Sequence, residues 1–214
     1  RLVVGKEPVQ VCVVGALLAM TPSLYLTYGI NWKTHSALMG LGVSLLVTGI
    51  LAAASMDWGH MTGFSSDEAT FLVAAIDTPL DLRDLLLGGI IISVLGVLDD
   101  VCIGQASTIL ELRKANPALK WRNLFQRGMR VGRDHIASVV NTLMMAYIGA
   151  AMPLFLLLFV SNTPMLQTLN RELLAEEIVR TLVGSLGLIM AVPITSVIAS
   201  LVAQNLEIEP LPRM

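Results

Sequence analysis

Five apolar stretches, each close to the roughly 20 residues that a helix needs to cross a bilayer, constrain the fold of this chain more than any other feature. They cover residues 9–29, 36–56, 85–109, 136–160 and 178–203. The composition agrees, because 55% of the 214 residues are hydrophobic and only 14% are charged, whereas a soluble domain carries roughly 25% charged residues. The sequence therefore predicts an all-α, polytopic membrane helix bundle of about five transmembrane helices, forming one domain over residues 1–214. A shorter apolar piece, residues 69–76, is too short to span and is expected at the membrane interface or against the bundle.

The charged residues predict an orientation. Basic side chains gather between the third and fourth apolar stretches: Arg113, Lys114, Lys120, Arg122, Arg127, Arg130 and Arg133. By the positive-inside rule, residues 111–134 and the C-terminus are expected in the cytoplasm, and the acid-rich segment 57–84 is expected on the other side of the membrane. We expect this membrane to be the cell membrane of a prokaryote. Apolar and basic residues alternate within 111–134, which is typical of an amphipathic helix lying on the anionic inner leaflet. Such a segment would be an anchor, a hinge or a partner surface.

Two adjacent carboxylates, Asp99 and Asp100, lie inside the third apolar stretch. A charged side chain near the middle of a membrane helix costs at least ~2.5–3.5 kcal/mol, so such acids usually face the bundle interior and handle ions or protons. Steps of three and four residues from Asp100 meet small or polar residues, whereas the same steps from Asp99 meet larger apolar ones. Asp100 is therefore predicted to face the bundle, and repulsion between the two acids favours a shared proton or a bound Na⁺. The supporting helix-packing face comprises Ser93, Gly96, Gly104, Ser107 and Glu111 on this helix and Ser138 on the next.

A second interpretation of the acid pair is positional. If the third helix ended near Val101, both carboxylates would lie where water reaches them and would only position the basic loop. Against this, Ile103, Ile109 and Leu110 continue the apolar pattern beyond the pair.

The fourth and fifth apolar stretches also carry polar and small residues. Asn141 and Thr142 lie in the fourth, where Asn141 could hydrogen-bond to Asp100 or could simply fasten two helices together; such bonds contribute only ~0.6–2 kcal/mol in bilayers. Together with the acids, these two residues complete the set of ion- or proton-coupling candidates. In the fifth stretch small residues predict a third wall of a closely packed bundle: Gly184, Gly187, Ala191, Thr195 and Ala199.

Other kinds of site have little support in the sequence. Cys12 and Cys102 both lie in apolar segments, and His35, His60 and His135 are scattered, so no disulfide framework and no metal-ligand spacing arises. The chain contains neither a phosphate-binding glycine loop nor a serine nucleophile elbow. We therefore expect no catalytic activity, no cofactor, no metal and no nucleic-acid partner. The chain begins with Arg1 rather than Met, so we expect it to be the C-terminal part of a longer protein.

Several strings resemble the YibE/F-like membrane proteins. The resemblance covers essentially the whole chain and is densest over residues 88–153. It implies an upstream portion with another membrane helix and an extracytoplasmic segment. The matching strings and residues are Gly96-Val97-Leu98-Asp99-Asp100, Gln105-Ala106-Ser107, Glu111, Asn116-Pro117, Gly132-Arg133-Asp134, Asn141-Thr142-Leu143, Ala146-Tyr147, Gly149, Glu176-Glu177-Ile178, Leu182-Val183-Gly184-Ser185 and Pro193-Ile194-Thr195.

The order of an acid-bearing span, a basic amphipathic stretch and a span with an Asn-Thr pair is more distantly similar to the membrane half of SecD and SecF, relatives of the RND exporters. This likeness implies a half-RND arrangement in which intramembrane acids couple proton or sodium flow to work outside the cytoplasm. The chain has Ser138 where SecF-like proteins carry an Arg one turn before the Asn-Thr pair, so a direct Asp-to-Arg switch is not implied.

Two functions remain open from the sequence. The first is an ion- or proton-coupled transporter or export-assisting protein that uses the intramembrane carboxylates. The second is a non-transporting scaffold or partner subunit, in which the acids and Asn141 fix helix packing. In either case the partners expected are the lipid bilayer, and a second copy or a paired membrane subunit.

Overall fold

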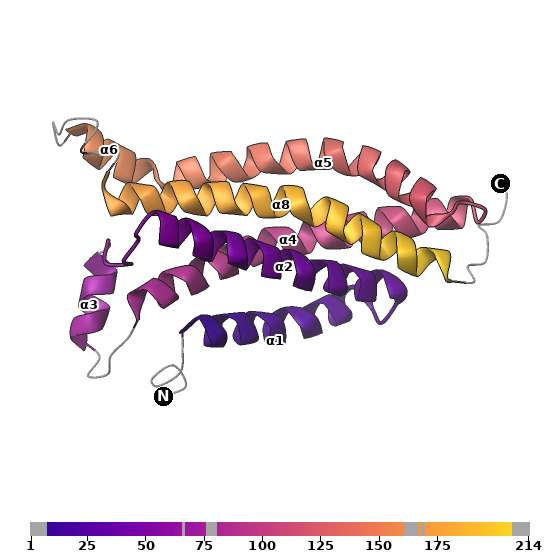
Figure 1. The fold of residues 1–214 in the computed structure, drawn as a ribbon, viewed down its shortest axis with the longest axis horizontal. Coiled ribbons are helices and arrows are strands. Elements are labelled where there is room, and N and C mark those ends of the chain that lie inside the picture. Colours follow the sequence, from indigo (N-terminus) through magenta and orange to yellow (C-terminus); the bar gives the residue numbers. More distant parts are fainter. Residues whose placement is uncertain (1–7, 66, 76–80, 161–166, 168–169, 207–214) are drawn as a thin grey trace.

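The computed structural model describes residues 8–65, 67–75, 81–160, 167 and 170–206, and all regular secondary structure in them is helical (Figure 1). The chain termini, and with them the cytoplasmic placement of the C-terminus, lie outside these residues. Long helices run side by side, and a short one lies across one end of the bundle. In chain order the helices are α1 (Pro8–Tyr28), α2 (Trp32–Trp58), α3 (Asp67–Ala75), α4 (Leu82–Ala115), α5 (Trp121–Ala150), α6 (Met152–Val160) and α8 (Glu172–Gln204).

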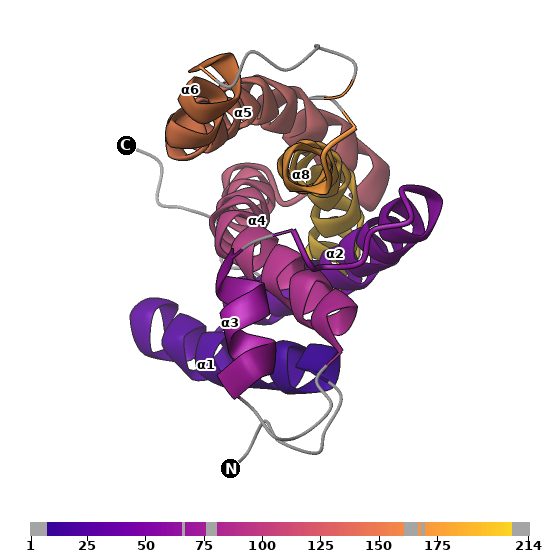
Figure 2. The same cartoon turned by 90° about the vertical axis from the view of Figure 1, so that its left-hand side faces the viewer.

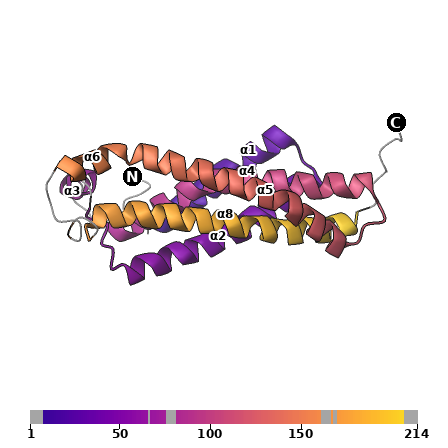
Figure 3. The same ribbon diagram turned by 90° about the horizontal axis from the view of Figure 1, so that it is seen from above.

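Helix α4 runs through the middle of the bundle. It packs against α2, α8, α1 and α5, while α2 and α5 each also pack against α8 (Figure 2). The core combines large apolar side chains of α4, such as Ile90, Leu98 and Ile109, with α8 residues such as Leu188 and Val192. Seen from above, α5 lies along α8 over most of its length (Figure 3). A prediction of an all-α bundle is confirmed.

Four of these helices are long and apolar enough to cross a membrane, or five if the α5–α6 pair is one span, counting only the described residues. The predicted ranges 9–29, 36–56, 85–109 and 178–203 correspond to α1, α2, α4 and α8. The fourth range, 136–160, is divided instead, because α6 is bent by 50° from α5 across the break at Ala151. Pro153 follows this break, and its missing backbone N–H removes one helical hydrogen bond there. The short apolar piece corresponds to α3, with Ile76 outside the described residues.

The segment predicted to be one amphipathic stretch, 111–134, is divided between two helices. Residues 111–115 are the end of α4, and residues 121–134 are the first half of α5, which continues without a break to Ala150. Gly128 and Gly132 are buried, and a Cβ atom on either would collide with Ile109 or Gln105 of α4. These two glycines let α5 approach α4 closely, so the segment packs along the bundle while its arginines stay exposed.

Local polar contacts fix where helices begin. Asn31 caps α2, since its side-chain oxygen accepts a hydrogen bond from the Thr34 backbone N–H at 3.0 Å. Asp81 caps α4 in the same way, accepting from Arg83 N at 2.9 Å. At the acid-rich end, Glu172 accepts a hydrogen bond from Gly63 N at 2.8 Å, which ties the loop after α2 to the start of α8. The two caps therefore fix helix starts, and the Glu172 contact joins two helix ends.

Candidate functional site: the carboxylate pair of α4

The two acids of α4 face different surroundings, and not in the predicted way. Asp100 is exposed, whereas Asp99 is half-buried beside the inward positions Leu98 and Cys102. The prediction that Asp100 faces the bundle is therefore wrong for this subunit. Of the two acids, Asp99 is the one that lies toward the interior of the bundle.

The physical reason lies in which helix supplies the small residues. Inside the bundle α4 presents bulky side chains, and its neighbours supply glycines to receive them: Val94 lies 3.5 Å from the Cβ position of Gly184 on α8, and Ile109 fills the space at Gly128 on α5. The small-residue face of α4 itself points outward. In a membrane, close contact favours small residues on either partner, so a stripe on one helix does not say which side it packs on.

The Asp99 carboxylate carries an unmet hydrogen-bonding group. Its Oδ1 atom is buried and has no hydrogen-bond partner among the residues that the structure describes. Asp100 likewise has no hydrogen bond or ion pair in the described chain. A buried polar atom without a partner is costly, so such an atom usually indicates a bound species or a functional role.

A seam of buried hydroxyl groups runs between α2, α4 and α8 next to Asp99. Its hydrogen bonds are Thr195 Oγ1 to Cys102 Sγ at 3.3 Å and Gln105 Nε2 to Ser196 Oγ at 2.7 Å. Ser44 Oγ and Ser200 Oγ, both buried, have no partner among the described residues. We define the hydroxyl seam by its buried members, which are Ser44, Thr48, Thr195, Ser196 and Ser200.

Of this seam, the sequence pattern indicates only Thr195, as one of the small residues of the fifth apolar stretch. A signal for the rest was present, because Ser36, Gly40, Ser44 and Thr48 recur every four residues along α2 and therefore share one face of the helix. Gly40 packs directly on Thr195, and Thr48 fills the space at Gly187, so α2 and α8 meet along this face.

The polar residues of α5 do not reach the acids within one subunit. Ser138, Asn141 and Thr142 are all exposed, and the Thr142 hydroxyl donates to Ser138 O at 3.1 Å. Asn141 lies away from the buried side of α5, which is marked by Gly132 and Leu143. The proposed hydrogen bond from Asn141 to Asp100 is therefore not made inside this chain.

The predicted packing face of α4 is likewise turned outward. Gly96, Gly104 and Glu111 are exposed, and Ser93 and Ser107 are half-buried. Ser93 Oγ donates to the backbone oxygen of Ile90 at 2.8 Å.

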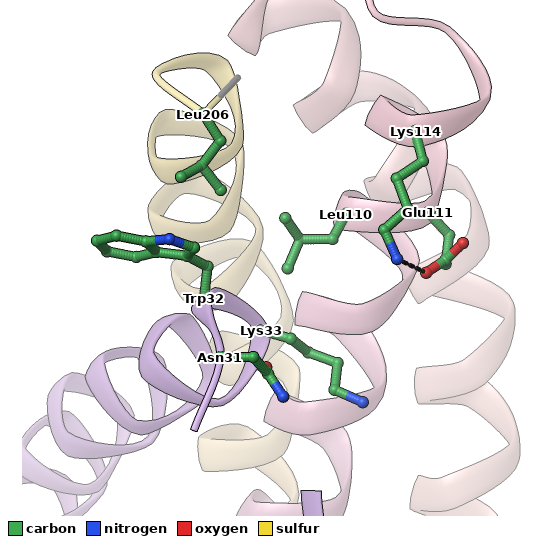
Figure 4. A pocket seen from close by; sticks show the side chains of 7 residues that line it. All are labelled: Asn31, Trp32, Lys33, Leu110, Glu111, Lys114 and Leu206. Atoms are coloured by element: carbon green, nitrogen blue, oxygen red, sulfur yellow. Dashed lines mark hydrogen bonds and ion pairs between the residues drawn. The ribbon is translucent and has the colours of Figure 1, made fainter. Parts of the chain in front are cut away.

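Glu111 belongs to a pocket at the basic end of the bundle. It pairs with Lys114 at 2.8 Å, and both side chains line a pocket of about 350 Å³ that is completed by Asn31, Trp32 and Lys33 of α2 (Figure 4). This pocket is partly apolar, because Leu110 and Leu206 also line it.

Among the described residues, no group of three or more His, Cys, Asp or Glu side chains could hold a metal ion. The histidine whose contacts are seen, His35, interacts with residues close to it in the sequence. His35 Nδ1 lies 2.8 Å from Asn31 O, and its ring packs against Tyr25 and Trp32.

The fold and the apolar helices together define an integral membrane protein with several membrane-spanning helices. Comparison with family models is more specific, because the YibE/F-like protein family matches residues 1–205. The chain belongs to this family. No curated protein and no solved structure matches it, and the distant similarity to SecD and SecF has no support.

Proposed function

We propose that this protein is the membrane part of an ion- or proton-coupled transport or export-assisting system, in which the Asp99–Asp100 pair of α4 binds the coupling ion. The observation that supports this most is the buried, unpartnered Oδ1 atom of Asp99. The proposal gives Asp99 the leading role and keeps Asp100 as the second acid, on the open side of the same helix.

The electrostatics of the pair support a change of occupancy. A carboxylate partly removed from water with no cationic partner is disfavoured, and this favours uptake of a proton or a cation by Asp99. The adjacent Asp100 adds repulsion between like charges, and this repulsion weakens as soon as either acid is protonated or holds Na⁺. Occupancy of the pair therefore changes the charge on α4 at the edge of its packed face.

The hydroxyl seam offers polar groups next to the pair. Cys102, one turn from Asp99, accepts a hydrogen bond from Thr195, and Ser44 and Ser200 leave hydroxyl oxygens unpaired among the described residues. Such groups can accept or donate as protonation at Asp99 changes, because a hydroxyl rotates to suit its partner. The seam therefore couples the state of α4 to its packing against α2 and α8.

We place the basic end of the bundle in the cytoplasm. Lys33, Arg113 and Lys114 lie at the end where α1 meets α2 and where α4 and α8 finish, while Asp57 and Asp81 lie at the other. This charge asymmetry follows the positive-inside rule. In this orientation the acid pair lies in the inner half of the membrane.

The alternative is a non-transporting scaffold that recruits a partner. The exposed side of the first half of α5 favours it, since Asn123, Gln126, Arg127 and Arg130 line an open pocket of about 430 Å³. In that case Asp99 and the seam would only fix helix packing. The structure weakens one version of this alternative, because neither acid is paired with a cation in the described chain.

The deciding experiment compares the full chain with Asp99→Asn, Asp100→Asn and the double variant in proteoliposomes. Internal pH and Na⁺ are followed with entrapped dyes under an imposed proton or sodium gradient. We expect the wild type to dissipate one of the gradients, Asp99→Asn to abolish this, and Asp100→Asn to reduce it, because Asp99 is the inward acid.

The matched control is Glu177→Gln, which also removes one carboxylate but pairs with Arg180 at the outer end of α8. It should keep wild-type flux. Thermal unfolding in detergent shows whether each variant stays folded. Equal flux in folded wild type and folded Asp99→Asn would reject the transport proposal, and altered packing or partner recovery in the same variant would support the scaffold.

A further inference from the structure

The outward face of α4 is the least explained surface of the subunit. We call it the α4 stripe and define it by residues at helical spacing. Viewed along the bundle, α1 and α5 flank α4 and none of the described helices covers the side between them (Figure 2). The residues of the stripe are Gly89, Ser93, Gly96, Asp100, Gly104, Ser107 and Glu111.

The stripe carries polar side chains, and its glycines have open space beside them. A Cβ atom on Gly89, Gly96 or Gly104 would have no atom within 4 Å, so nothing in this subunit requires glycine there. Asp100 lies at the centre of the stripe without a partner in the described chain, and facing lipid would cost it at least ~2.5–3.5 kcal/mol. Small residues that permit close approach, around an acid that must be covered, are typical of a helix-packing surface.

The outer face of α5 also carries exposed polar side chains, and here several of them are basic or able to donate hydrogen bonds. Ser138 and Asn141 are exposed on a membrane-spanning helix, and further toward the basic end Arg127 and Arg130 are exposed on the same side. No hydrogen bond from Asn141 is seen within the described chain. These groups favour a polar, acidic surface over hydrocarbon.

The two faces match in register. Gly128 contacts Ile109, Gly132 contacts Gln105, and Leu143 and Val94 both lie against Gly184. These contacts fix one constant register between the antiparallel α4 and α5. It sets Ala137 level with Asp100, so Ser138 lies at the depth of the acid.

The same register orders the other polar groups of the two faces. Asn141 is level with Gly96, one turn outward from Asp100, and Arg130 is level with Ser107, one turn from Glu111. Asp134, an acid that is exposed on the same face, falls level with Ile103. The α5 face therefore offers hydrogen-bonding groups at the depth of Asp100, and cations near the depth of Glu111 in addition to Lys114.

We propose that the α4 stripe is covered by α5 of a second copy of this chain, in a symmetric dimer whose two-fold axis runs along the membrane normal. Such an axis keeps every residue at its own depth, and an isologous interface places each α5 on the other subunit's stripe. Ser138 and Asn141 of one copy then hydrogen-bond to Asp100 of the other, while Arg127 and Arg130 lie beside Glu111. The dimer does not depend on the proposed transport function.

A second copy fits better than an unrelated partner because one chain carries both halves of the match. The glycines of the stripe admit a helix closely, and the α5 outer face supplies hydrogen-bond donors and then cations at the depths of the two acids. A different helix, from another protein or from residues upstream of those described, would have to reproduce this order by chance.

The test is cysteine cross-linking between two differently tagged copies of the full chain, co-expressed and oxidised in native membranes. In a Cys12→Ala, Cys102→Ser background, one copy carries Gly96→Cys and the other Asn141→Cys. We expect a covalent dimer bearing both tags. In the control Leu46→Cys replaces Gly96→Cys, at a similar depth on the exposed side of α2, and the dimer band should be lost.

A second variant keeps the test independent of the cysteines at the interface. Gly96→Leu fills open space in the subunit, so the monomer should stay folded while the dimer, measured by mass in detergent, shifts to the monomer. Gly42→Leu is its matched control, because a Cβ there also meets nothing within 4 Å, and it should remain dimeric.

Three results would overturn the proposal: equal cross-linking in the Leu46 control, an unchanged dimer in Gly96→Leu, or capture at Gly96→Cys of a different protein or of another part of its own chain. Each of these readouts is independent of ion flux, so the dimer can fail while the transport proposal stands.

Discussion

The two faces of α4 use glycine in opposite ways. On the inward face α4 is bulky, and glycines on the neighbouring helices receive it, as Gly184 receives Val94. On the outward face the glycines belong to α4 itself, and a Cβ atom on Gly96 or Gly104 would meet no atom within 4 Å. The inward face is a finished helix interface, whereas the outward face has the composition of an interface without its partner.

This comparison teaches what small residues can and cannot reveal in a membrane protein. In water a helix turns its apolar side inward, but lipid is as apolar as a side chain, so hydrophobicity does not distinguish the two faces. The polar groups then carry more information than the small ones. Asp99 and Gln105 lie toward the packed side, and Asp100 and Glu111 mark the open one.

The largest difference between the faces should come from removing bulk. Leu98 is 0% exposed and Ile92 is 47% exposed. Leu98→Ala should lower the free energy of unfolding by about 3 kcal/mol, because it leaves a cavity in the hydrophobic core. Ile92→Ala should change it by less than about 0.5 kcal/mol. Reversible unfolding in mixed detergent micelles measures both, and equal losses would mean that the outward face is packed within the subunit.

Adding a methyl group should destabilise the packed side and stabilise the open side, and both effects should be smaller than that of Leu98→Ala. Gly187→Ala places a methyl group against the Thr48 side chain, and we expect the free energy of unfolding to fall by about 2 kcal/mol through overpacking. Gly104→Ala meets open space and should stabilise the monomer by up to about 1 kcal/mol, since alanine has the higher helix propensity. The same unfolding measurement, made on the monomer, decides. A destabilised Gly104→Ala monomer would contradict the open face.

A still smaller effect is expected from the polar contact within the packed side. Gln105→Leu keeps the volume but removes the hydrogen bond to Ser196, which should cost about 1 kcal/mol, as interhelical hydrogen bonds do in bilayers. Ser196 Oγ still donates to Val192 O at 2.6 Å, so no new unpaired group is created on α8. The matched change on the open side, Ser107→Leu, should leave the monomer unaffected. If Gln105→Leu lowered the free energy of unfolding by much more than about 1 kcal/mol, Gln105 would also support other members of the hydroxyl seam.

Sequence reasoning recovered the helices better than their faces. Runs of apolar residues located α1, α2, α4 and α8, because each run must be helical to satisfy its backbone in lipid. The inward acid was misidentified, since the choice between Asp99 and Asp100 rested on small residues alone. The basic and apolar alternation of 121–134 predicts an amphipathic helix but does not show what that helix packs against. The contacts at Gly128 and Gly132 show that it continues as the first half of α5 and packs on the bundle.

The smallest effect within the monomer concerns Glu111, the residue of the α4 stripe that lies at the basic end of the bundle. Glu111 pairs with Lys114 on its own helix, and both side chains are largely exposed, so Glu111→Gln should change monomer stability by less than about 0.5 kcal/mol. The same substitution removes the charge expected to lie beside Arg127 and Arg130 of a second copy. Measured in detergent at low salt, the dimer should therefore weaken, and high salt should bring the wild type toward the variant by screening the same contact. If salt and Glu111→Gln both left the dimer unchanged, the basic face of α5 would lie elsewhere, and only the Asp100 end of the stripe would support the pairing. Glu111→Gln therefore tests whether the outward face of α4 takes part in the dimer while leaving the monomer almost unchanged.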